Sequence, residues 1–352
     1  FALELEDELM NFSDVSYKSF VKSESEIITL FYDKFADIPL LSRMDAVAET
    51  FIDEIETLLN RDLPEEERIP LIEKFRKMYE TMDFYVLYNR FLKKEGYQTL
   101  PRRPLEKRKL RYEDVYPVLY LKYRLSRQAE RSNIKHLVID EMQDYSRLQY
   151  LIIRRMFSCK MTILGDRAQT MADQQQDVLQ FLPGIFGKDL RRIEMRKSYR
   201  NTVEIASYAA NLIGVTDLEL FERHGMPVLE RNVTDLEAAL REAVDTLFPE
   251  EKTYETAAVI VPDEKTAERA YLILREILVE KDFDCEKRLS WLNRDSSSFK
   301  KGLTVTTFYL AKGLEFDQVF SIFPKDEKRE MMMQAQYIAA TRALHELRVY
   351  HI

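Results

Sequence analysis

The chain has 352 residues, of which 45% are hydrophobic and 32% are charged, a composition typical of a globular protein with room for two or three domains. It has no apolar run long enough for a membrane span, no signal-peptide pattern, and only two isolated cysteines, so a disulfide framework and a zinc site are excluded and a cytoplasmic location is expected. The net charge of −8 argues against strong nonspecific affinity for DNA but leaves room for a local basic groove.

Residues 1–130 are predicted to be helical. Ser23 and Glu26 form a capping box ahead of an apolar run, and Leu63–Glu66 separates two helices. Apolar residues recur at helical spacing in the first of these helices: Met44, Val47, Phe51, Ile55, Leu58 and Leu59. An aromatic stripe follows: Tyr79, Phe84, Tyr85, Tyr88 and Phe91. We interpret this stripe as the core of a helical bundle, with a partner-binding face as the alternative.

One dense basic run lies near the end of this helical region. Its members are Arg102, Arg103, Lys107, Arg108, Lys109 and Arg111. Cations at this density are able to contact the phosphates of a nucleic acid. The alternative is a solvated connector between domains, since Pro101 and Pro104 stand at the start of the run.

Two carboxylates follow the next apolar segment. Residues 137–139 are predicted to form a short buried parallel strand, which leads directly into Asp140 and Glu141. In open α/β sheets, ligand-binding groups lie just beyond the carboxyl ends of such strands. One carboxylate suits a Mg²⁺ ion, and its neighbour suits a water to be activated for phosphoryl transfer. An ordinary acidic turn is the alternative.

A second strand, residues 160–164, ends in another polar cluster, residues 165–170. The amphipathic stretch 148–157 lies between the two strands and completes a β-α-β unit. The two polar clusters are therefore expected side by side at one edge of a sheet. Chance explains one such cluster easily and two adjacent clusters poorly.

Residues 193–352 are predicted to form a second α/β domain. A buried strand at 256–261 precedes an amphipathic helix at 264–280. Further strands are predicted at 303–307, 318–322 and 347–350. The expected fold class is therefore α/β, with parallel sheets.

Five segments, in order, resemble the motifs of a UvrD-like superfamily 1 helicase motor. They are the DExxD-type segment Asp140–Asp144, the GDxxQ segment Gly165–Gln169, Ser198–Arg200, the KGLEFD segment Thr307–Asp317, and the TRA segment Tyr337–Ala343. The resemblance implies two RecA-like parallel-sheet motor domains, the first one incomplete, preceded by an α-helical insertion. It assigns residues 1–130 to the insertion, 131–192 to the remnant of the first motor domain and 193–352 to the second.

The resemblance also implies roles for single residues around ATP and Mg²⁺. Asp140 would hold the metal, Glu141 would activate the attacking water, and Gln169 would sense the γ-phosphate. Arg200 and Arg342 would stabilise transition-state charge as arginine fingers. Tyr199 would stack near the adenine and Glu315 would contact the ribose, with Gly313 allowing close backbone approach. Without the motif context, a surface ion pair explains Arg342 better, and only the TRA segment reverses this interpretation. A core tyrosine is the alternative for Tyr199.

The phosphate-binding loop that this family needs, G-x-x-x-x-G-K-[ST], is absent, because none of the eight glycines has that spacing. We expect a fragment that begins downstream of the loop, whose missing N-terminal part would be a partner; a naturally loop-less relative is the alternative. ATP and Mg²⁺ are expected only with that part present. The segment Thr170–Gln176 also lacks the aromatic residues that stack on single-stranded DNA in the repair helicases, which puts strand tracking in doubt.

Within the family, the sequence is most similar to the HelD-like branch, whose members bind RNA polymerase. The likeness is carried by residues 110–114 with 119–121, by residues 25–32 followed by 39–43, and by Tyr309. Two functions follow as hypotheses. The first is the C-terminal part of an ATP-driven motor acting on DNA or RNA polymerase. The second is a non-hydrolysing module that docks on RNA polymerase through residues 1–130.

Overall fold

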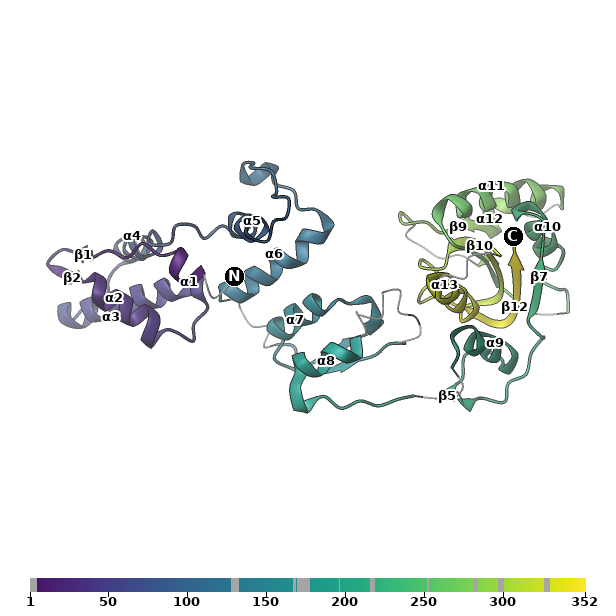
Figure 1. Cartoon of the computed structure of the whole chain (residues 1–352), viewed down its shortest axis with the longest axis horizontal. Coiled ribbons are helices and arrows are strands. Elements are labelled where there is room, and N and C mark those ends of the chain that lie inside the picture. The colour runs from purple at the N-terminus through teal and green to yellow at the C-terminus, as the bar shows by residue number, and fades with distance from the viewer. Residues whose placement is uncertain are drawn as a thin grey trace. The chain divides into compact units, whose positions relative to one another are not determined.

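The computed structural model describes residues 5–127, 133–166, 169, 178–195, 197–215, 219–251, 253–281, 284–296, 301–325 and 330–352. The chain divides into two compact units (Figure 1). Unit 1 comprises Phe1–Leu164 and Val178–Leu190, and unit 2 comprises Gly165–Asp177 and Arg191–Ile352. Each unit has its own hydrophobic cores. None of the described helices combines the length and the apolar stretch needed to cross a membrane.

The first part of unit 1 is mainly helical, as predicted. Its elements are α1 (Leu5–Glu8), β1 (Val15–Tyr17), β2 (Phe20–Lys22), α2 (Glu24–Thr29), α3 (Arg43–Leu59), α4 (Glu65–Arg76), α5 (Phe84–Lys94) and α6 (Tyr112–Leu125). The predicted capping box is present, because the Ser23 side chain accepts from the Glu26 N–H and the Glu26 side chain accepts from the Ser23 N–H. Pro64 caps α4, where the sequence predicted the break between two helices.

The apolar spacing of α3 predicts its core only in part. Met44, Val47, Phe51 and Ile55 are buried. Leu58 and Leu59 share this helical spacing but are 72% and 36% exposed. Both lie in the last turn of α3, next to the left-handed Asn60 that ends the helix, where no described element covers them. The aromatic stripe is core, because Tyr79, Tyr85 and Tyr88 are buried and Phe84 and Phe91 pack against them.

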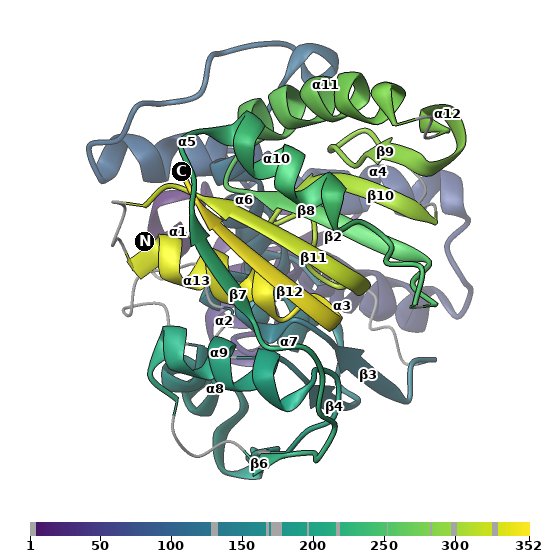
Figure 2. The same ribbon diagram turned by 90° about the vertical axis from the view of Figure 1, so that its right-hand side faces the viewer.

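The second part of unit 1 is the predicted β-α-β unit. It comprises β3 (His136–Ile139), α7 (Arg147–Met156), β4 (Lys160–Ile163) and α8 (Val178–Phe186). Strands β3 and β4 pair in parallel, with Ile139 opposite Ile163 (Figure 2). The prediction of a buried strand was wrong, however. Ile139 packs against residues of α7 and α8, whereas Val138, which alternates to the other face, is 60% exposed, because no described element covers that face.

Unit 2 is built on a six-stranded sheet with the order β7-β12-β11-β8-β10-β9, in which every pairing is parallel (Figure 2). The strands are β7 (Leu229–Asn232), β8 (Thr256–Val261), β9 (Leu289–Trp291), β10 (Gly302–Thr307), β11 (Phe316–Phe323) and β12 (Ala343–His351). The helices are α9 (Val203–Ile213), α10 (Leu236–Asp245), α11 (Glu264–Glu280), α12 (Cys285–Arg288) and α13 (Glu330–Ala340). A short pair, β5 (Lys197–Ser198) and β6 (Glu219–Leu220), lies outside this sheet.

Helices cover both faces of this sheet, as the sequence of β8 requires. Ala257, Val259 and Val261 pack with residues of α10 and α11. Ala258 and Ile260 point the other way and pack with residues of α9 and α13. A strand that is buried on both faces has a continuous apolar sequence, and for this reason the sequence predicted β8 well. The predicted fold class, α/β with parallel sheets, is confirmed.

Asp317, the last residue of the KGLEFD segment, ties β11 to the start of β8. Its Oδ2 accepts hydrogen bonds from the Glu255 N–H, the Thr256 N–H and the Thr256 hydroxyl, each at 2.9 Å. Burial alone would raise the pKa of this carboxyl, but the hydrogen bonds from Glu255 and Thr256 outweigh burial and lower it. His345 Nε2 lies 3.8 Å from the other oxygen.

We expect Asp317→Ala to lower the free energy of unfolding of the chain by about 2 kcal/mol near pH 7, since it removes charge-assisted hydrogen bonds. The pKa of Asp317 is lower in the folded chain than in the unfolded chain. The stabilisation by Asp317 is therefore fully present above its unfolded pKa and is lost as the pH falls through its folded pKa. Urea unfolding at neutral and acid pH measures the difference. The exposed Asp245→Ala is the matched control. An Asp317→Ala penalty that does not shrink in acid would contradict this account.

Candidate functional site

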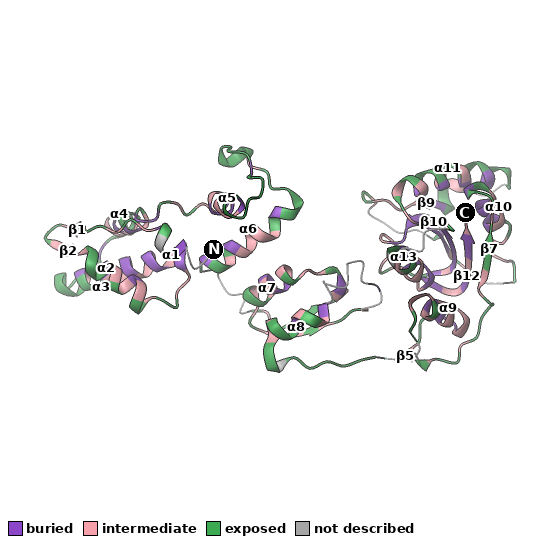
Figure 3. Ribbon diagram, in the orientation of Figure 1, coloured by how far each residue is buried: buried purple, intermediate pink, exposed green. Residues whose placement is uncertain are grey.

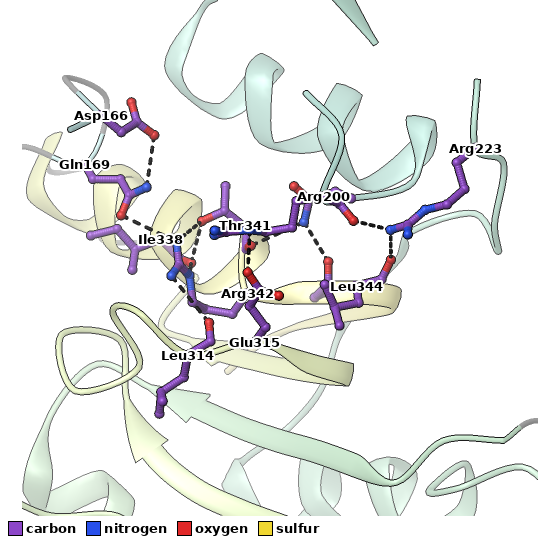
Figure 4. Close-up of polar contacts among 12 residues, drawn as sticks. Asp166, Gln169, Arg200, Arg223, Leu314, Glu315, Ile338, Thr341, Arg342 and Leu344 are labelled. Carbon is purple, nitrogen blue, oxygen red and sulfur yellow. Dashed lines mark hydrogen bonds and ion pairs between the residues drawn. The ribbon is translucent and has the colours of Figure 1, made fainter. Parts of the chain in front are cut away.

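A polar cluster lies at the amino-terminal ends of β11 and β12 in unit 2 (Figure 4). Glu315 precedes β11 and Arg342 precedes β12. The register pairs Phe316 with Ala343, so the residues just before them are neighbours across the two strands. The Phe316 N–H donates to the Arg342 carbonyl at 2.9 Å, which fixes this corner of the backbone.

Arg342 is the buried centre of this cluster, with 1% of its surface exposed. Its Nε donates to the Ile338 carbonyl at 3.2 Å, and its two terminal nitrogens donate to the Leu314 carbonyl at 3.4 Å and to Gln169 Oε1 at 3.5 Å. A buried guanidinium persists only when its donors are satisfied in this way. The alternative interpretation of Arg342 as a surface ion-pair residue is therefore wrong.

Gln169 joins two of the sequence motifs. It is 7% exposed, and its Nε2 donates to Asp166 Oδ2 at 3.0 Å. The Tyr337 hydroxyl donates to the same oxygen at 3.0 Å. Burial raises the pKa of Tyr337, and the Asp166 charge raises it further, so this phenol stays protonated and remains a donor. A chain of contacts thus runs from Tyr337 through Asp166 and Gln169 to Arg342. Figure 4 shows the part from Asp166 to Arg342.

Arg200 and Glu315 form an ion pair, with Nε of Arg200 2.7 Å from a Glu315 oxygen. Both side chains are nearly half exposed, at 46% and 42%. A pair this exposed contributes only about 0.2–1 kcal/mol. A stronger anion, such as a phosphate, is therefore able to replace the carboxylate at Arg200.

The backbone that carries Arg200 is held by two neighbours. Asn201 Nδ2 donates to the Ala343 carbonyl at 2.6 Å. Arg223 donates to the Arg200 carbonyl and, at 2.9 Å, to the Leu344 carbonyl. These side chains connect the segment after β5 to the start of β12.

Tyr199 is on the surface, with 60% of its area exposed, so the alternative of a core tyrosine is wrong. Its ring centroid lies 5.6 Å from that of Phe221, and Lys197 Nζ lies 5.5 Å from its centroid. An exposed aromatic ring beside a lysine suits a planar base that carries phosphates.

Gly313 has a φ of +76°, a left-handed conformation that favours glycine. A Cβ atom at this position would meet no heavy atom within 4 Å. Backbone conformation, rather than close approach to another part of the described chain, therefore accounts for this glycine.

Asp140 and Glu141 lie in unit 1, directly after β3. Glu141 has a φ of +51°, which for a residue other than glycine costs about 1–3 kcal/mol and is typical of functional sites. Its N–H donates to Asp140 Oδ1 at 2.8 Å, and the Gln143 amide donates to Glu141 Oε2 at 2.6 Å. The strained turn therefore holds both carboxylates in fixed positions.

The carboxylate of Asp140 suits a metal that arrives with its nucleotide. Asp140 is exposed, and within the described chain its second carboxylate oxygen has no hydrogen-bond partner. No three His, Cys, Asp or Glu side chains of the described residues gather to hold a metal by themselves. Mg²⁺ in phosphoryl-transfer sites needs only one or two carboxylates, with phosphate oxygens and water completing its shell.

Sequence reasoning missed four positioning residues: Asp166, Asn201, Arg223 and Tyr337. Asp166 and Tyr337 stand inside recognised motifs, so the motifs themselves carried a signal for them. Asn201 follows Arg200 directly, but nothing in the local sequence marks Arg223. The segment Thr170–Gln176, singled out for its lack of aromatic residues, lies outside the described residues.

Comparison with known families places this site in context. Residues 5–171 match the model of the UvrD/REP helicase N-terminal domain. This match covers Asp140 and Glu141 of unit 1 and Gln169 of unit 2. None of the curated proteins compared with the chain matches it.

Several solved structures are similar to the chain. One is the C-terminal domain of a possible DNA helicase from Lactobacillus plantarum WCFS1, with 24% identity, a TM-score of 0.35, and coverage of 44% of this chain and 88% of that one. Another is the PRRSV helicase, with 17% identity, a TM-score of 0.34, and coverage of 62% and 35%. A third is the arterivirus nonstructural protein 10 helicase in complex with DNA, with 13% identity, a TM-score of 0.35, and coverage of 76% and 51%. The chain thus spans 35% and 51% of the length of these two viral helicases.

Proposed function

We propose that the chain is the C-terminal portion of an ATP-dependent superfamily 1 motor of the UvrD/HelD type. In this proposal, residues 131–192 and 193–352 belong to two RecA-like motor domains, and residues 1–130 are a helical insertion. ATP hydrolysis would be coupled to movement on DNA or to remodelling of a complex that contains nucleic acid. The match of residues 5–171 to a helicase domain model supports the class of activity.

One observation carries the proposal. Arg342 donates a hydrogen bond to Gln169, although the two residues lie 173 positions apart in the sequence. The resemblance gives Gln169 the role of γ-phosphate sensor and Arg342 the role of arginine finger. A phosphate that draws Arg342 toward itself would weaken the bond to Gln169, and through Gln169 the bond to Asp166. Such a linked change is what coupling of nucleotide state to motion requires.

Several residues would serve ATP and Mg²⁺ when both are bound. Bound Mg²⁺ supplies charge neutralisation on the phosphates, and Asp140 would hold it. Glu141, fixed by the Gln143 amide, would orient and deprotonate water. Arg200 would exchange the Glu315 carboxylate for a phosphate oxygen, which leaves Glu315 to accept from the ribose.

RNA polymerase is the partner that the HelD-like likeness adds to this proposal. The alternative function is a non-hydrolysing module that docks on polymerase through residues 1–130. Because the aromatic stripe of α5 is buried in the core, a docking surface on this region must use other residues.

Turnover requires a phosphate-binding loop, so its tests use an extended protein, defined as this chain joined to a segment that carries such a loop. We expect Tyr199→Ala in the extended protein to weaken ATP and ADP binding by about 5- to 150-fold, because stacking on one base is worth about 1–3 kcal/mol. Fluorescent-nucleotide titration measures both affinities.

Tyr199→Phe keeps the ring and is the matched control, with affinity close to that of the wild type. Binding of inorganic triphosphate should not change in either variant, because it has no base. Wild-type affinity for ATP in Tyr199→Ala would count against the assignment of this nucleotide site.

A further inference from the structure

The segment that joins α5 to α6 is a concentrated positive surface in an acidic protein. Residues 97–111 contain six cations and one acid, Glu106, so their net charge is 6 − 1 = +5, whereas the whole chain carries −8. Figure 3 shows this segment exposed along nearly its whole length. The sequence left two interpretations open for it, phosphate contact and solvated connector.

The segment is anchored rather than loosely attached. Asn89 on α5 exchanges two hydrogen bonds with the backbone of Leu100, at 2.7 Å and 3.2 Å. The Tyr85 hydroxyl donates to the Pro101 carbonyl at 2.8 Å. Arg108 bonds Asp83 at 2.5 Å, and its guanidinium lies 4.9 Å from the centre of the Tyr85 ring. A surface held in this way loses little conformational entropy on binding a ligand.

The far end of the segment is fixed by a second arginine. Arg111 donates to both oxygens of Asp114, at 2.6 Å and 3.2 Å, and Tyr88 donates to the same carboxylate at 2.7 Å. Burial alone would raise the pKa of Asp114, but the bonds from Arg111 and Tyr88 outweigh burial and lower it. Arg108 and Arg111 therefore hold the segment in place. Both oxygens of Asp114 are already bonded to Arg111, so Asp114 does not pair with the other cations of the segment.

The other four cations have no such role. Arg102, Arg103, Lys107 and Lys109 are exposed, and in the described part of the chain their side chains form no ion pair or hydrogen bond. Cations that only solubilise a connector need neither this density nor a rigid frame beneath them. Their arrangement is that of a site for a polyanion.

Aromatic rings flank these four cations on both sides in the sequence. Tyr97 is 64% exposed and Tyr112 is 80% exposed. Tyr112 and Tyr116 stand one turn apart on α6 with their rings edge to face, 6.4 Å between centroids, so Tyr116 supports the Tyr112 ring, which remains 80% exposed. Exposed aromatic rings and unpaired cations within one short segment are what unpaired bases and their phosphates require.

We propose that this connector surface, made of Tyr97, Arg102, Arg103, Lys107, Lys109 and Tyr112, binds single-stranded nucleic acid. Phosphates would pair with the four cations, and bases would stack on the two tyrosines. The inference rests on the proposed function for its ligand class, because a helicase-type motor must hold a nucleic-acid strand. An acidic protein would satisfy the cations but would leave the tyrosine faces without a matching partner.

Fluorescence anisotropy with labelled oligo(dT) and oligo(rU) of about 16 nucleotides tests the proposal on the chain without ATP. Replacing Arg102, Arg103, Lys107 and Lys109 together by alanine should weaken binding by roughly 100-fold. Each lost phosphate contact lowers the slope of log K against log salt by about 0.7, so four lower it by about 3. The matched control replaces two arginines and two lysines exposed elsewhere on unit 1, Arg61, Lys77, Lys93 and Arg124, and should change affinity by less than about 2-fold.

A second variant separates stacking from charge. Tyr112→Ala should weaken oligonucleotide binding by roughly 10-fold, leave binding of base-free polyphosphate unchanged, and be rescued by Tyr112→Phe. Wild-type oligonucleotide affinity in the fourfold variant would overturn the proposal. Polyphosphate bound as tightly as oligonucleotides would also overturn it and would indicate an acidic protein partner. This assay contains no ATP or ADP. A negative result for oligonucleotide binding would therefore leave the proposed nucleotide site at Tyr199 to be tested by its own experiment.

Discussion

Replacing Arg342 by lysine in the extended protein is expected to lower the rate of ATP hydrolysis by about 10³-fold or more. The guanidinium reaches the Ile338 and Leu314 carbonyls and Gln169 at once, from a site that is 1% exposed. A lysine keeps the charge but cannot repeat the planar fork that spans these partners. The rate of phosphate release at saturating ATP measures this decrease in ATP hydrolysis.

Arg348→Lys is the matched control for this experiment. Arg348 lies on β12, the strand that Arg342 directly precedes, and it is partly buried, but it pairs with Glu346 outside the cluster. The Arg348→Lys variant should hydrolyse ATP at close to the wild-type rate. Thermal unfolding of both variants separates loss of catalysis from loss of fold. If Arg342→Lys were folded and hydrolysed ATP within about 2-fold of the wild type, its role as an arginine finger would be refuted.

Replacing Glu141 by glutamine is expected to lower hydrolysis in the extended protein by about 10²- to 10⁴-fold, because the amide cannot take a proton from water. The change is nearly isosteric and keeps the left-handed turn, so ATP binding should be retained. Measuring nucleotide affinity beside phosphate release therefore separates binding from chemistry. Glu113→Gln, on an exposed glutamate of the same unit, should leave both quantities unchanged.

The sequence predicted local structure best where one pattern decides it. The continuous apolar run of β8 and the amphipathic period of α11 predicted both sets of bounds, Thr256–Val261 and Glu264–Glu280. Burial in β3 was predicted less well. Its apolar residues are correct for a strand, but the exposure of Val138 depends on which elements cover each face, and that information is not local.

The site was predictable only as far as its motifs reach. Motif resemblance named Gln169 and Arg342, but no local pattern predicts their contact or the burial of Arg342. The pairing of Arg200 with Glu315 likewise depends on the register of β11 and β12. Arg223 contributes through hydrogen bonds to backbone carbonyls, which any sequence offers, so its role appears only in three dimensions.

The central claim is that Glu141 and Arg342 form part of an ATPase site that another segment completes. Phosphate release by the chain alone and by the extended protein tests this claim most directly. We predict no measurable release by the chain alone, and steady release by the extended protein that falls by at least about 10²-fold in Glu141→Gln. Steady release by the chain alone that disappears in its own Glu141→Gln variant would contradict the claim. Hydrolysis by the extended protein that is insensitive to Glu141→Gln would contradict it as well.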